Sequence, residues 1–249
     1  MALAQLALED GELAKNMELA WAAAREAASR GADLLCLPEA ADFGWLHQQA
    51  RRDALPVPGR YTEFLAGLAR RHKMWICGGC LERDEERVYN AALLMDRAGR
   101  ILLKHRKIHT LPELTAHLYD AGTNDRPLSV ETEFGRVAVT ICADNFDIAI
   151  PKRAATEGAW LLVAPHGFAA EVERMEKNSE EFQAHIRGVA LKTGLWVAGT
   201  NVALARVKGG AWKGQMHCGC SMVARPDGSA AATGPFKQAA LVVCDIPAE

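Results

Sequence analysis

The strongest constraint on the fold is the stretch 137–146, which reads V-A-V-T-I-C-A-D-N-F. Its first five residues carry no charge and are mainly β-prone, which predicts a buried strand of a sheet. The strand would end at Cys142, because a short polar tract follows. Open α/β sheets bind their ligands beyond the carboxyl ends of the strands, so we expect Cys142 at a rim that a ligand can reach.

Two further apolar runs also end in ionisable groups. The run 34–37 leads into Pro38 and Glu39, and the strand-like run 101–103 is followed by the basic tract 104–107. A single free cysteine is more often a core residue than a reactive one. A carboxylate, a basic tract and a thiol at three strand ends favour a shared site over that alternative.

The three motifs together resemble the nitrilase superfamily of carbon–nitrogen hydrolases. Glu39 stands in L-P-E, Lys107 in R-K-I-H and Cys142 in V-T-I-C-A-D, in that order along the chain. The resemblance extends over nearly the whole chain, from its opening strand and helix to the stretch 222–228, M-V-A-R-P-D-G. Each motif alone is weak, but three in order form a specific signature. The resemblance implies that these three residues are a catalytic triad.

The predicted elements follow a mixed order. Residues 3–8 and 32–37 read as strands on either side of a helix at 13–30, which has one apolar face at helical spacing. Such a β-α-β unit predicts parallel strands, whereas the short turns that follow predict antiparallel pairs. Further strands are predicted at 74–81, 88–96, 100–103, 160–164, 195–200, 220–224 and 240–246, a hairpin through Phe134-Gly135 at 131–142, and helices at 62–72, 151–158 and 178–194.

This order suggests two mixed sheets packed together with helices on the outside. No linker, low-complexity segment or break in composition divides the chain, so we expect one domain over residues 1–249. The resemblance implies the same α/β architecture, a four-layer α-β-β-α sandwich.

Charge and hydropathy exclude several classes of function. The formal net charge is −2 and no basic face stands out, which argues against nucleic acid or an anionic membrane as the main partner. No apolar run approaches the ~20 residues that span a bilayer, and the N-terminus lacks the features of a signal peptide. We therefore expect a cytoplasmic protein.

The seven cysteines do not form a fully paired disulfide framework, because their number is odd. Reduced thiols fit the expected cytoplasmic location. Cys77 and Cys80, and the cluster of His217, Cys218 and Cys220, invite a zinc interpretation. Residues 76–81 also read as a buried strand, however, and the second cluster lacks the usual finger spacing. We predict no metal and no cofactor.

Amide hydrolysis needs a nucleophile, a proton shuttle and a group that stabilises the oxyanion. Cys142 fits the first role, since a thiolate attacks carbonyl carbon well. Glu39 fits the second, and the ammonium of Lys107 fits the third, joined by the backbone N–H of Ala143. The resemblance thus implies a thioester on Cys142 and release of ammonia.

Other residues near the motifs receive weaker assignments. Members of the superfamily often carry a second glutamate after the lysine, and Glu113 is the best match, although a surface glutamate on a helix is the alternative. Asn145 and Phe146 fall in the region that lines the substrate pocket. His166, just past a strand, either faces the substrate or is a hydrogen-bonded structural residue. His109 and His117 in the 106–126 loop receive no chemical role.

The leading hypothesis is a cysteine-dependent amidase acting on a small carboxamide, for which an ω-amide of a dicarboxylic acid is a candidate. The sequence after Cys142 is Ala-Asp, where true nitrilases commonly have Trp-Glu, and this favours an amide over a nitrile. An N-carbamoyl amide hydrolase and a catalytically idle homologue that binds a small molecule are the alternatives. The Arg-aromatic-Pro-Glu tract common in the superfamily is missing, so no arginine is assigned to a substrate carboxylate.

A second copy of the chain is the expected macromolecular partner. Helices outside a sheet sandwich commonly bury one layer against a twin subunit, and the helix at 178–194 is the candidate for that face of a homodimer or higher homo-oligomer.

Overall fold

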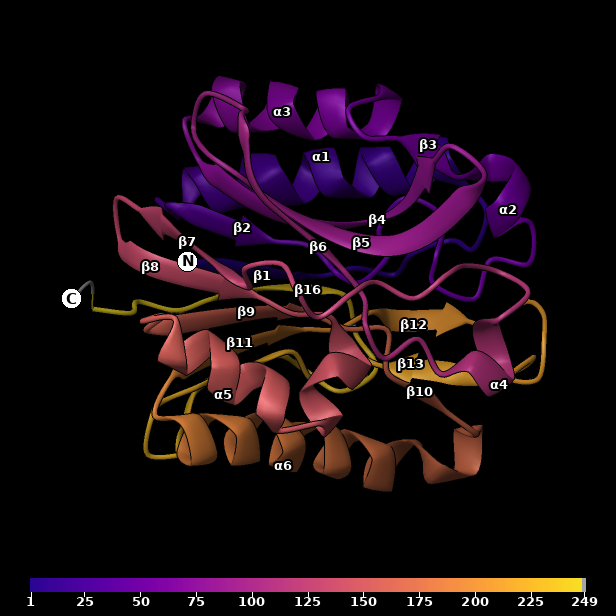
Figure 1. Cartoon of the computed structure of the whole chain (residues 1–249). Coiled ribbons are helices and arrows are strands. Elements are labelled where there is room, and N and C mark those ends of the chain that lie inside the picture. The colour runs from indigo at the N-terminus through magenta and orange to yellow at the C-terminus, as the bar shows by residue number, and fades with distance from the viewer. Residues whose placement is uncertain (248–249) are drawn as a thin grey trace.

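The computed structural model describes residues 1–247 and contains two large mixed sheets packed face to face, with helices on both outer faces (Figure 1). This is the predicted four-layer α-β-β-α sandwich. None of the helices in residues 1–247 is both long and apolar enough to cross a membrane.

The first sheet runs in the order β16-β1-β2-β4-β5-β6, and β3 pairs with β4 outside this path. Its central pairs, β1 with β2 and β2 with β4, are parallel, whereas β4, β5 and β6 form the predicted antiparallel meander. The strands are β1 (Ala2–Gln5), β2 (Leu34–Cys36), β3 (Leu55–Pro56), β4 (Trp75–Asp84), β5 (Arg87–Met95), β6 (Ile101–Arg106) and β16 (Ala240–Val243).

The second sheet repeats this plan in the order β15-β14-β11-β9-β8-β7. The pairs β8 with β9 and β9 with β11 are parallel, and the outer pairs are antiparallel. The strands are β7 (Ser129–Thr132), β8 (Gly135–Val139), β9 (Leu161–Pro165), β11 (Trp196–Thr200), β14 (Met222–Ala224) and β15 (Ala230–Thr233); a small third sheet contains β10 (Ala169–Ala170), β12 (Ala203–Arg206) and β13 (Met216–Cys218).

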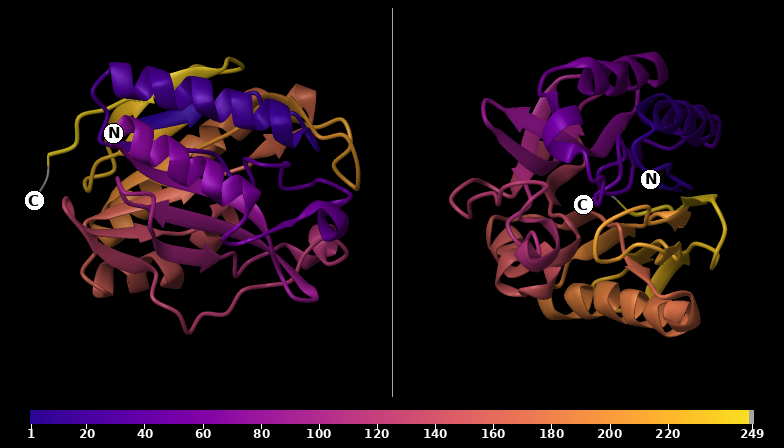
Figure 2. Two further views of the ribbon diagram at one scale, coloured as in Figure 1. Left: turned by 90° about the horizontal axis from the view of Figure 1, so that it is seen from above. Right: turned by 90° about the vertical axis from the view of Figure 1, so that its right-hand side faces the viewer.

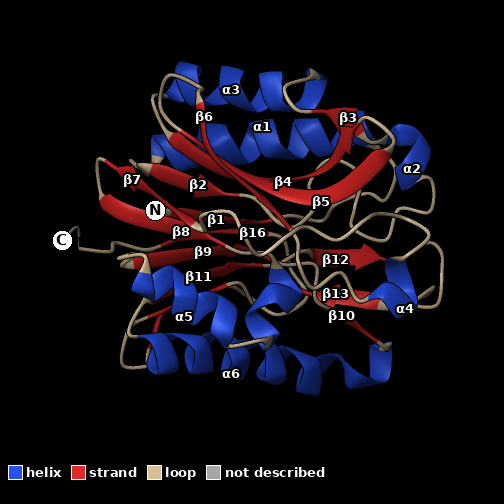
Figure 3. Ribbon diagram, in the orientation of Figure 1, coloured by secondary structure: helices blue, strands red, loops and turns tan. Residues whose placement is uncertain are grey.

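Two pairs of helices cover the sandwich (Figure 3). Helices α1 (Leu13–Ser29) and α3 (Arg60–His72) lie side by side on the first sheet, as Figure 2 shows from above. Helices α5 (Ala149–Thr156) and α6 (Met175–Thr193) cover the second sheet. The shorter helices are α2 (Ala50–Asp53), α4 (Pro112–Thr115), η1 (Cys142–Phe146) and η2 (Val172–Arg174).

The start of α3 differs from the sequence prediction. The sequence predicted a helix at 62–72, but the helix begins at Arg60 and Gly59 precedes it. The Thr62 hydroxyl accepts a hydrogen bond from the Gly59 N–H at 2.8 Å. Because Gly59 has no side chain to make the reciprocal bond, only one half of a capping box forms at this helix start.

Three apolar cores correspond to the three spaces between the layers. The central core joins the sheets and includes Leu94 and Trp75 from the first and Val139 and Val163 from the second. The other two cores join each sheet to its helices. Cys77 belongs to the central core and Cys80 to the core under α1 and α3, so these two thiols face opposite sides of β4 and do not share a metal site.

Candidate active site

Glu39 follows β2 and is held in the rim of the first sheet. Its backbone N–H donates to the carbonyl of His166 at 3.4 Å, and only 1% of its surface is exposed. The backbone around Glu39 crosses directly over Gly79 of β4. A Cβ on Gly79 would lie 2.5 Å from the Pro38 carbonyl oxygen, so only glycine allows this close approach. The glutamate is thus positioned by a backbone contact between neighbouring strands.

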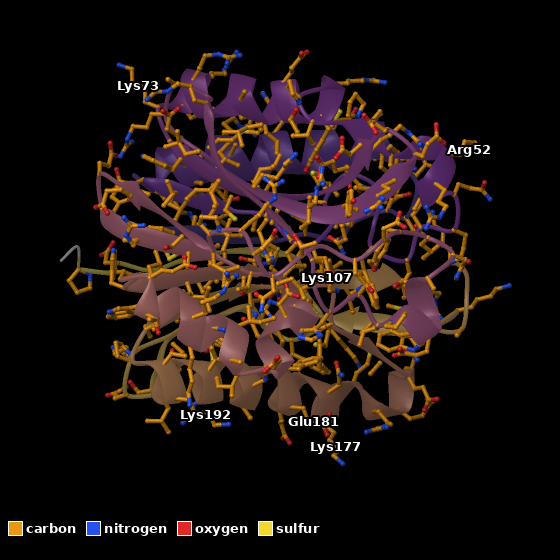
Figure 4. The ribbon with its side chains drawn as sticks, viewed as in Figure 1. Arg52, Lys73, Lys107, Lys177, Glu181 and Lys192 are labelled. Atoms are coloured by element: carbon orange, nitrogen blue, oxygen red, sulfur yellow. The ribbon has the colours of Figure 1, made fainter. Side chains whose placement is uncertain are left out.

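Lys107 follows β6, and its ammonium points into the interior of the molecule. Figure 4 shows Lys107 between the two sheets, whereas Arg52, Lys73 and Lys177 lie at the periphery. Lys107 Nζ donates to Glu39 Oε1 at 2.5 Å, and the Lys107 backbone N–H donates to the Asn90 carbonyl at 2.8 Å. Both side chains of the ion pair are fully buried.

Asn90 supports the same carboxylate from β5. Its side-chain Nδ2 donates to Glu39 Oε1 at 2.7 Å, so Oε1 accepts hydrogen bonds from both Asn90 and Lys107. The other oxygen, Oε2, has no hydrogen-bond partner within residues 1–247. One oxygen of Glu39 is therefore anchored while the other remains available for proton transfer.

Cys142 opens the short helix η1 after β8, in the left-handed region of backbone conformation, with φ 42°. Holding a residue other than glycine in this region costs of order 1–3 kcal/mol, and such strained residues cluster at functional sites. Burial and the nearby Glu39 carboxylate raise the pKa of the thiol to about 12, while the Lys107 ammonium and the Gly167 N–H oppose this rise. Glu39, Lys107 and Cys142 are thus close enough to act on one another.

The charge on Lys107 is stabilised by its neighbours. Burial alone would lower the pKa of Lys107, but the negative charges of Glu39 and of the Cys142 thiolate outweigh it, and the pKa is raised. Lys107 therefore remains an ammonium group beside the thiol. This is the electrostatic arrangement that a developing oxyanion requires.

Asp144 connects the loop that carries Lys107 to the turn that carries Cys142. Its carboxylate accepts hydrogen bonds from the N–H groups of Ile108 and His109, at 2.9 and 2.8 Å, and from the N–H of Ile141 at 3.1 Å. Its Oδ2 also pairs with Nε2 of the buried His105 at 2.7 Å. Burial would raise the pKa of Asp144, but the hydrogen bond and charge of His105, the His109 N–H and the charge of Lys107 together outweigh it, and the pKa is lowered.

The residues predicted to bind substrate lie in different environments. Ala143 is buried beside Cys142, and the Oδ1 of the buried Asn145 accepts a hydrogen bond from Thr140 at 2.8 Å. Phe146 is 51% exposed and packs edge-on against His185, with 4.8 Å between the two ring centroids. Of Asn145 and Phe146, therefore, only the aromatic ring is open to solvent near the turn.

His166 takes the structural alternative. It is fully buried, its ring pairs with the Ala164 carbonyl through Nδ1 at 2.7 Å, and it packs edge-on against Phe182 of α6. Burial, assisted by the charge of His185, lowers the pKa of His166 to about 3, so the ring is neutral. Its Nε2 has no hydrogen-bond partner within residues 1–247, and a contact between His166 and the substrate stays a prediction.

Glu113 does not take the place expected of a second glutamate. It lies in the first turn of the four-residue helix α4, and its side chain is exposed, whereas Lys107 is buried. Within residues 1–247 it is not among the groups that act on the charge of Lys107; the buried Tyr119 is. The turn of α4 directs Thr115 and Tyr119 inward and leaves Glu113 outside.

Four residues of this region were not predicted from the sequence: Trp45, Asn90, Asp144 and Gly167. Asn90 interrupts an otherwise apolar strand, which is a signal of a buried polar contact. Gly167 has no signal of its own. A Cβ there would lie 2.3 Å from Trp45 Cδ1 and 3.2 Å from Glu39 Oε2, so the need for glycine becomes visible only in the folded protein.

Comparisons with known proteins agree with this fold. The Carbon-nitrogen hydrolase family model matches residues 1–249. A mutant of the amidase from Nesterenkonia sp. AN1, solved with acrylamide added to its active-site cysteine, is 21% identical with a TM-score of 0.83 over 100% of this chain and 93% of its own.

Curated relatives match over shorter regions. Omega-amidase NIT2-B of Xenopus laevis is 29% identical over 160 residues, which cover 61% of this chain and 58% of that protein. The beta-ureidopropionase of Arabidopsis thaliana is 37% identical over 123 residues, which cover 45% of this chain and 30% of that protein. Because the family model matches the whole chain, this protein belongs to the carbon–nitrogen hydrolase family.

Proposed function

We propose that this carbon–nitrogen hydrolase is a cysteine-dependent amidase that converts a small carboxamide into a carboxylic acid and ammonia. The observation that carries the proposal is that Glu39 and Lys107 are buried beside the Cys142 thiol, and that Lys107 Nζ donates a hydrogen bond to Glu39 Oε1 at 2.5 Å. Burying an ion pair costs desolvation free energy, so a buried pair beside a thiol fits a functional role.

In the proposed reaction, Glu39 takes the proton of the Cys142 thiol as sulfur attacks the amide carbon. The carbon–sulfur bond forms, and the carbonyl oxygen becomes an oxyanion beside Lys107. Glu39 then donates its proton to the nitrogen, the carbon–nitrogen bond breaks, and ammonia leaves a thioester on Cys142. Water gives a proton to Glu39 as its oxygen attacks the thioester, and that proton returns to the sulfur when the acid leaves.

The experiment is a panel of small amides, ω-amides of dicarboxylic acids among them, with ammonia release as the readout. We expect wild-type turnover and its loss in Cys142→Ala. Cys36→Ala is the matched control, because Cys36 is also a buried thiol but lies within β2, before the strand end that carries Glu39. Activity that persists in Cys142→Ala would contradict the mechanism.

Chemical labelling separates an enzyme from a homologue that only binds a small molecule. The Nesterenkonia amidase was solved with acrylamide on its active-site cysteine. We expect acrylamide to modify Cys142 in preference to the other six cysteines, as located by mass spectrometry. Equal modification of all seven would favour the idle homologue.

An N-carbamoyl amide hydrolase is the second candidate. It is favoured by the 37% identity to a beta-ureidopropionase over 123 residues. The two candidates differ in their products, because a carbamoyl substrate releases carbon dioxide as well as ammonia. Measuring both gases with the same enzyme preparation distinguishes them.

Self-association through α6 is also proposed. Leu191 on this helix is 64% exposed, so the outer face of the helix offers an apolar side chain for such a contact. We expect sedimentation to show a dimer or larger assembly, and Leu191→Glu to dissociate it. A monomeric wild type would contradict this proposal.

A further inference from the structure

The segment 40–49, here called the Trp45 segment, connects the strand end that carries Glu39 to α2 and packs against the candidate active site. The Lys107 ammonium lies over the Trp45 ring, with 5.1 Å between Nζ and the ring centroid. An ammonium within about 6 Å of an indole face is attracted to it. A Cβ on Gly167 would lie 2.3 Å from Trp45 Cδ1, so the indole also packs directly on that backbone. The position of this segment therefore decides how the indole covers Lys107.

His47, in the same segment, lies between two carboxylates that come from different parts of the chain. Its Nε2 is 2.7 Å from Asp53 Oδ2 in α2, and its Nδ1 is 3.4 Å from Asp10 Oδ1 in the loop after β1. The Phe43 ring stacks on the imidazole, with 5.5 Å between the centroids, and a Cβ on Gly11 would lie 3.0 Å from His47 Cε1. The ring is 9% exposed, so its neighbours enclose it and each nitrogen faces a carboxylate.

This arrangement is satisfied only by a protonated ring. A neutral imidazole has one N–H donor and one acceptor nitrogen, whereas the imidazolium has two donors, and a carboxylate only accepts. The buried Asp10 Oδ1 accepts no hydrogen bond within residues 1–247, so the ion pair with His47 is the contact that offsets its charge there. Buried carboxylate oxygens are rarely left without a polar contact.

Two cations and a third carboxylate lie close to these partners. Arg52 Nε donates to Asp53 Oδ1 at 2.7 Å, and this hydrogen bond lowers the pKa of Asp53 to about 2, so that carboxyl stays ionised. Lys208 Nζ donates at 2.9 Å to the backbone carbonyl of Asp10 and not to its carboxylate. Burial raises the pKa of Asp42 to about 6, and the charge of the imidazolium opposes that rise. The surroundings of the imidazole are thus dominated by acidic groups.

The sign of the pH dependence follows from these contacts. The Asp10 carboxylate, together with Asp53, raises the pKa of His47 against the effect of burial. A free histidine titrates at about pH 6.5. Because the pKa is raised in the folded protein, the stabilisation from the two ion pairs is fully present below about pH 6.5 and is lost as the pH rises through the raised pKa.

We propose that His47 is a positioning residue, and that its protonated ring bridges Asp10 and Asp53 to hold the Trp45 segment against the active site. The inference rests on the amidase function proposed above. When this imidazolium bridge loses its proton, one ring nitrogen presents a lone pair to a carboxylate, and that contact becomes repulsive. The segment then loosens, Trp45 no longer covers Lys107 in one fixed position, and kcat falls.

The test is amide hydrogen exchange of residues 40–49 between about pH 6 and pH 9, corrected for the intrinsic effect of pH on exchange and measured alongside ammonia release. We expect wild-type protection to fall by about tenfold over this range, as for the loss of one hydrogen bond, and kcat to fall with it. His47→Gln has no ring proton to lose, so its protection should be low at every pH.

Asp10→Asn tests the bridge while His47 is retained. Removing one carboxylate lowers the preference for the charged ring, so the fall in protection should move to lower pH. His117→Gln is the matched control, because His117 Nε2 faces an amide, Gln48 Oε1 at 3.3 Å, and not a carboxylate. This control should leave both the protection and its pH dependence unchanged.

Helix α6 serves as an internal reference for global stability in the same exchange data. Equal loss of protection in α6 and in the Trp45 segment of His47→Gln would overturn the inference, as would wild-type protection that does not change with pH. Protection that falls as expected while kcat does not follow would also overturn it. If wild-type protein hydrolyses no amide or carbamoyl compound, the proposed function fails, whereas the exchange data still test the bridge.

Discussion

At the scale of single residues, the candidate site is built on opposed charges held out of water. Lys107 and Glu39 form a fully buried ion pair, and the Cys142 thiol lies beside both. Breaking a buried pair by removing one partner typically costs about 3–5 kcal/mol, because the remaining charge is left uncompensated. The pair is therefore expected to set both the protonation of the thiol and the stability of the rim.

Replacing Glu39 by glutamine should lower the pKa of Cys142 from about 12 and abolish turnover. The Glu39 carboxylate disfavours a second negative charge on sulfur, so its removal favours the thiolate beside Lys107. The measurement is the pH dependence of acrylamide modification of Cys142, which should shift toward lower pH. An unchanged or higher midpoint would mean that Glu39 does not face the thiol.

Replacing Asp144 by asparagine should loosen both the Lys107 loop and the Cys142 turn. The amide supplies only one acceptor oxygen where the carboxylate supplies two, so at least one buried N–H loses its partner, at a cost of about 1–3 kcal/mol. We expect kcat to fall with little change in KM, together with lower stability in urea. Asp147→Asn is the control, because Asp147 is half exposed on the same turn; an equal effect there would contradict the role of Asp144.

At the scale of elements, α6 lies directly on β11 because Gly199 has no side chain. A Cβ on Gly199 would lie 2.6 Å from Ile186 Cδ1 and 3.3 Å from Phe182 Cζ. Only glycine at position 199 therefore allows the helix and the strand to approach this closely. The same packing of α6 against the sheet buries His166, which contacts Phe182.

Gly199→Ala should destabilise the protein by about 1–3 kcal/mol through overpacking. Ile186→Ala alone should cost about 2–5 kcal/mol, but the double variant should cost less than the sum, because each change relieves the other. Gly188 also lies on α6, but a Cβ added there would meet no atom within 4 Å. Gly188→Ala should therefore stabilise the protein by about 0.5–1 kcal/mol. Additive effects in the urea unfolding of the double variant would show that helix and strand do not meet there.

At the scale of the whole molecule, the site depends on how the two sheets are aligned. Glu39 and Lys107 follow strands of the first sheet, whereas Cys142 follows a strand of the second. The central core joins the two sheets, so it bears directly on the distance between the ion pair and the thiol, whereas the two cores under the helices each lie on one sheet.

Leu94→Ala in the central core and Leu68→Ala in the core under α3 should each cost about 2–5 kcal/mol. Only Leu94→Ala should also lower kcat, because a cavity between the sheets lets Cys142 shift relative to Lys107. Both variants are compared by urea unfolding and by steady-state kinetics at a temperature where both are folded. Equal loss of kcat in the two would contradict this view of the core.

Local sequence patterns account for much of this protein. Apolar runs ending at Glu39 and Cys142 mark strand ends, and the short turns between residues 74 and 103 specify an antiparallel meander, since chain connectivity alone restricts the pairing. The motif order predicted the four-layer architecture, because each motif is contiguous in the chain, and the predicted pair Glu39 and Lys107 does meet at 2.5 Å; that they act with Cys142 as a catalytic triad stays a prediction. Glu113 shows the limit: a glutamate at the expected place in a motif lies on the outer face of its helix.

What only the tertiary structure decided is which polar groups meet. Asn90, Asp144 and Gly167 come from separate strands and loops, and their roles arise from contacts across the rim. Sequence determined where each strand ends, because burial and turn chemistry act over a few neighbouring residues. The fold determined which strand ends face each other, because that depends on two sheets packing through a shared core.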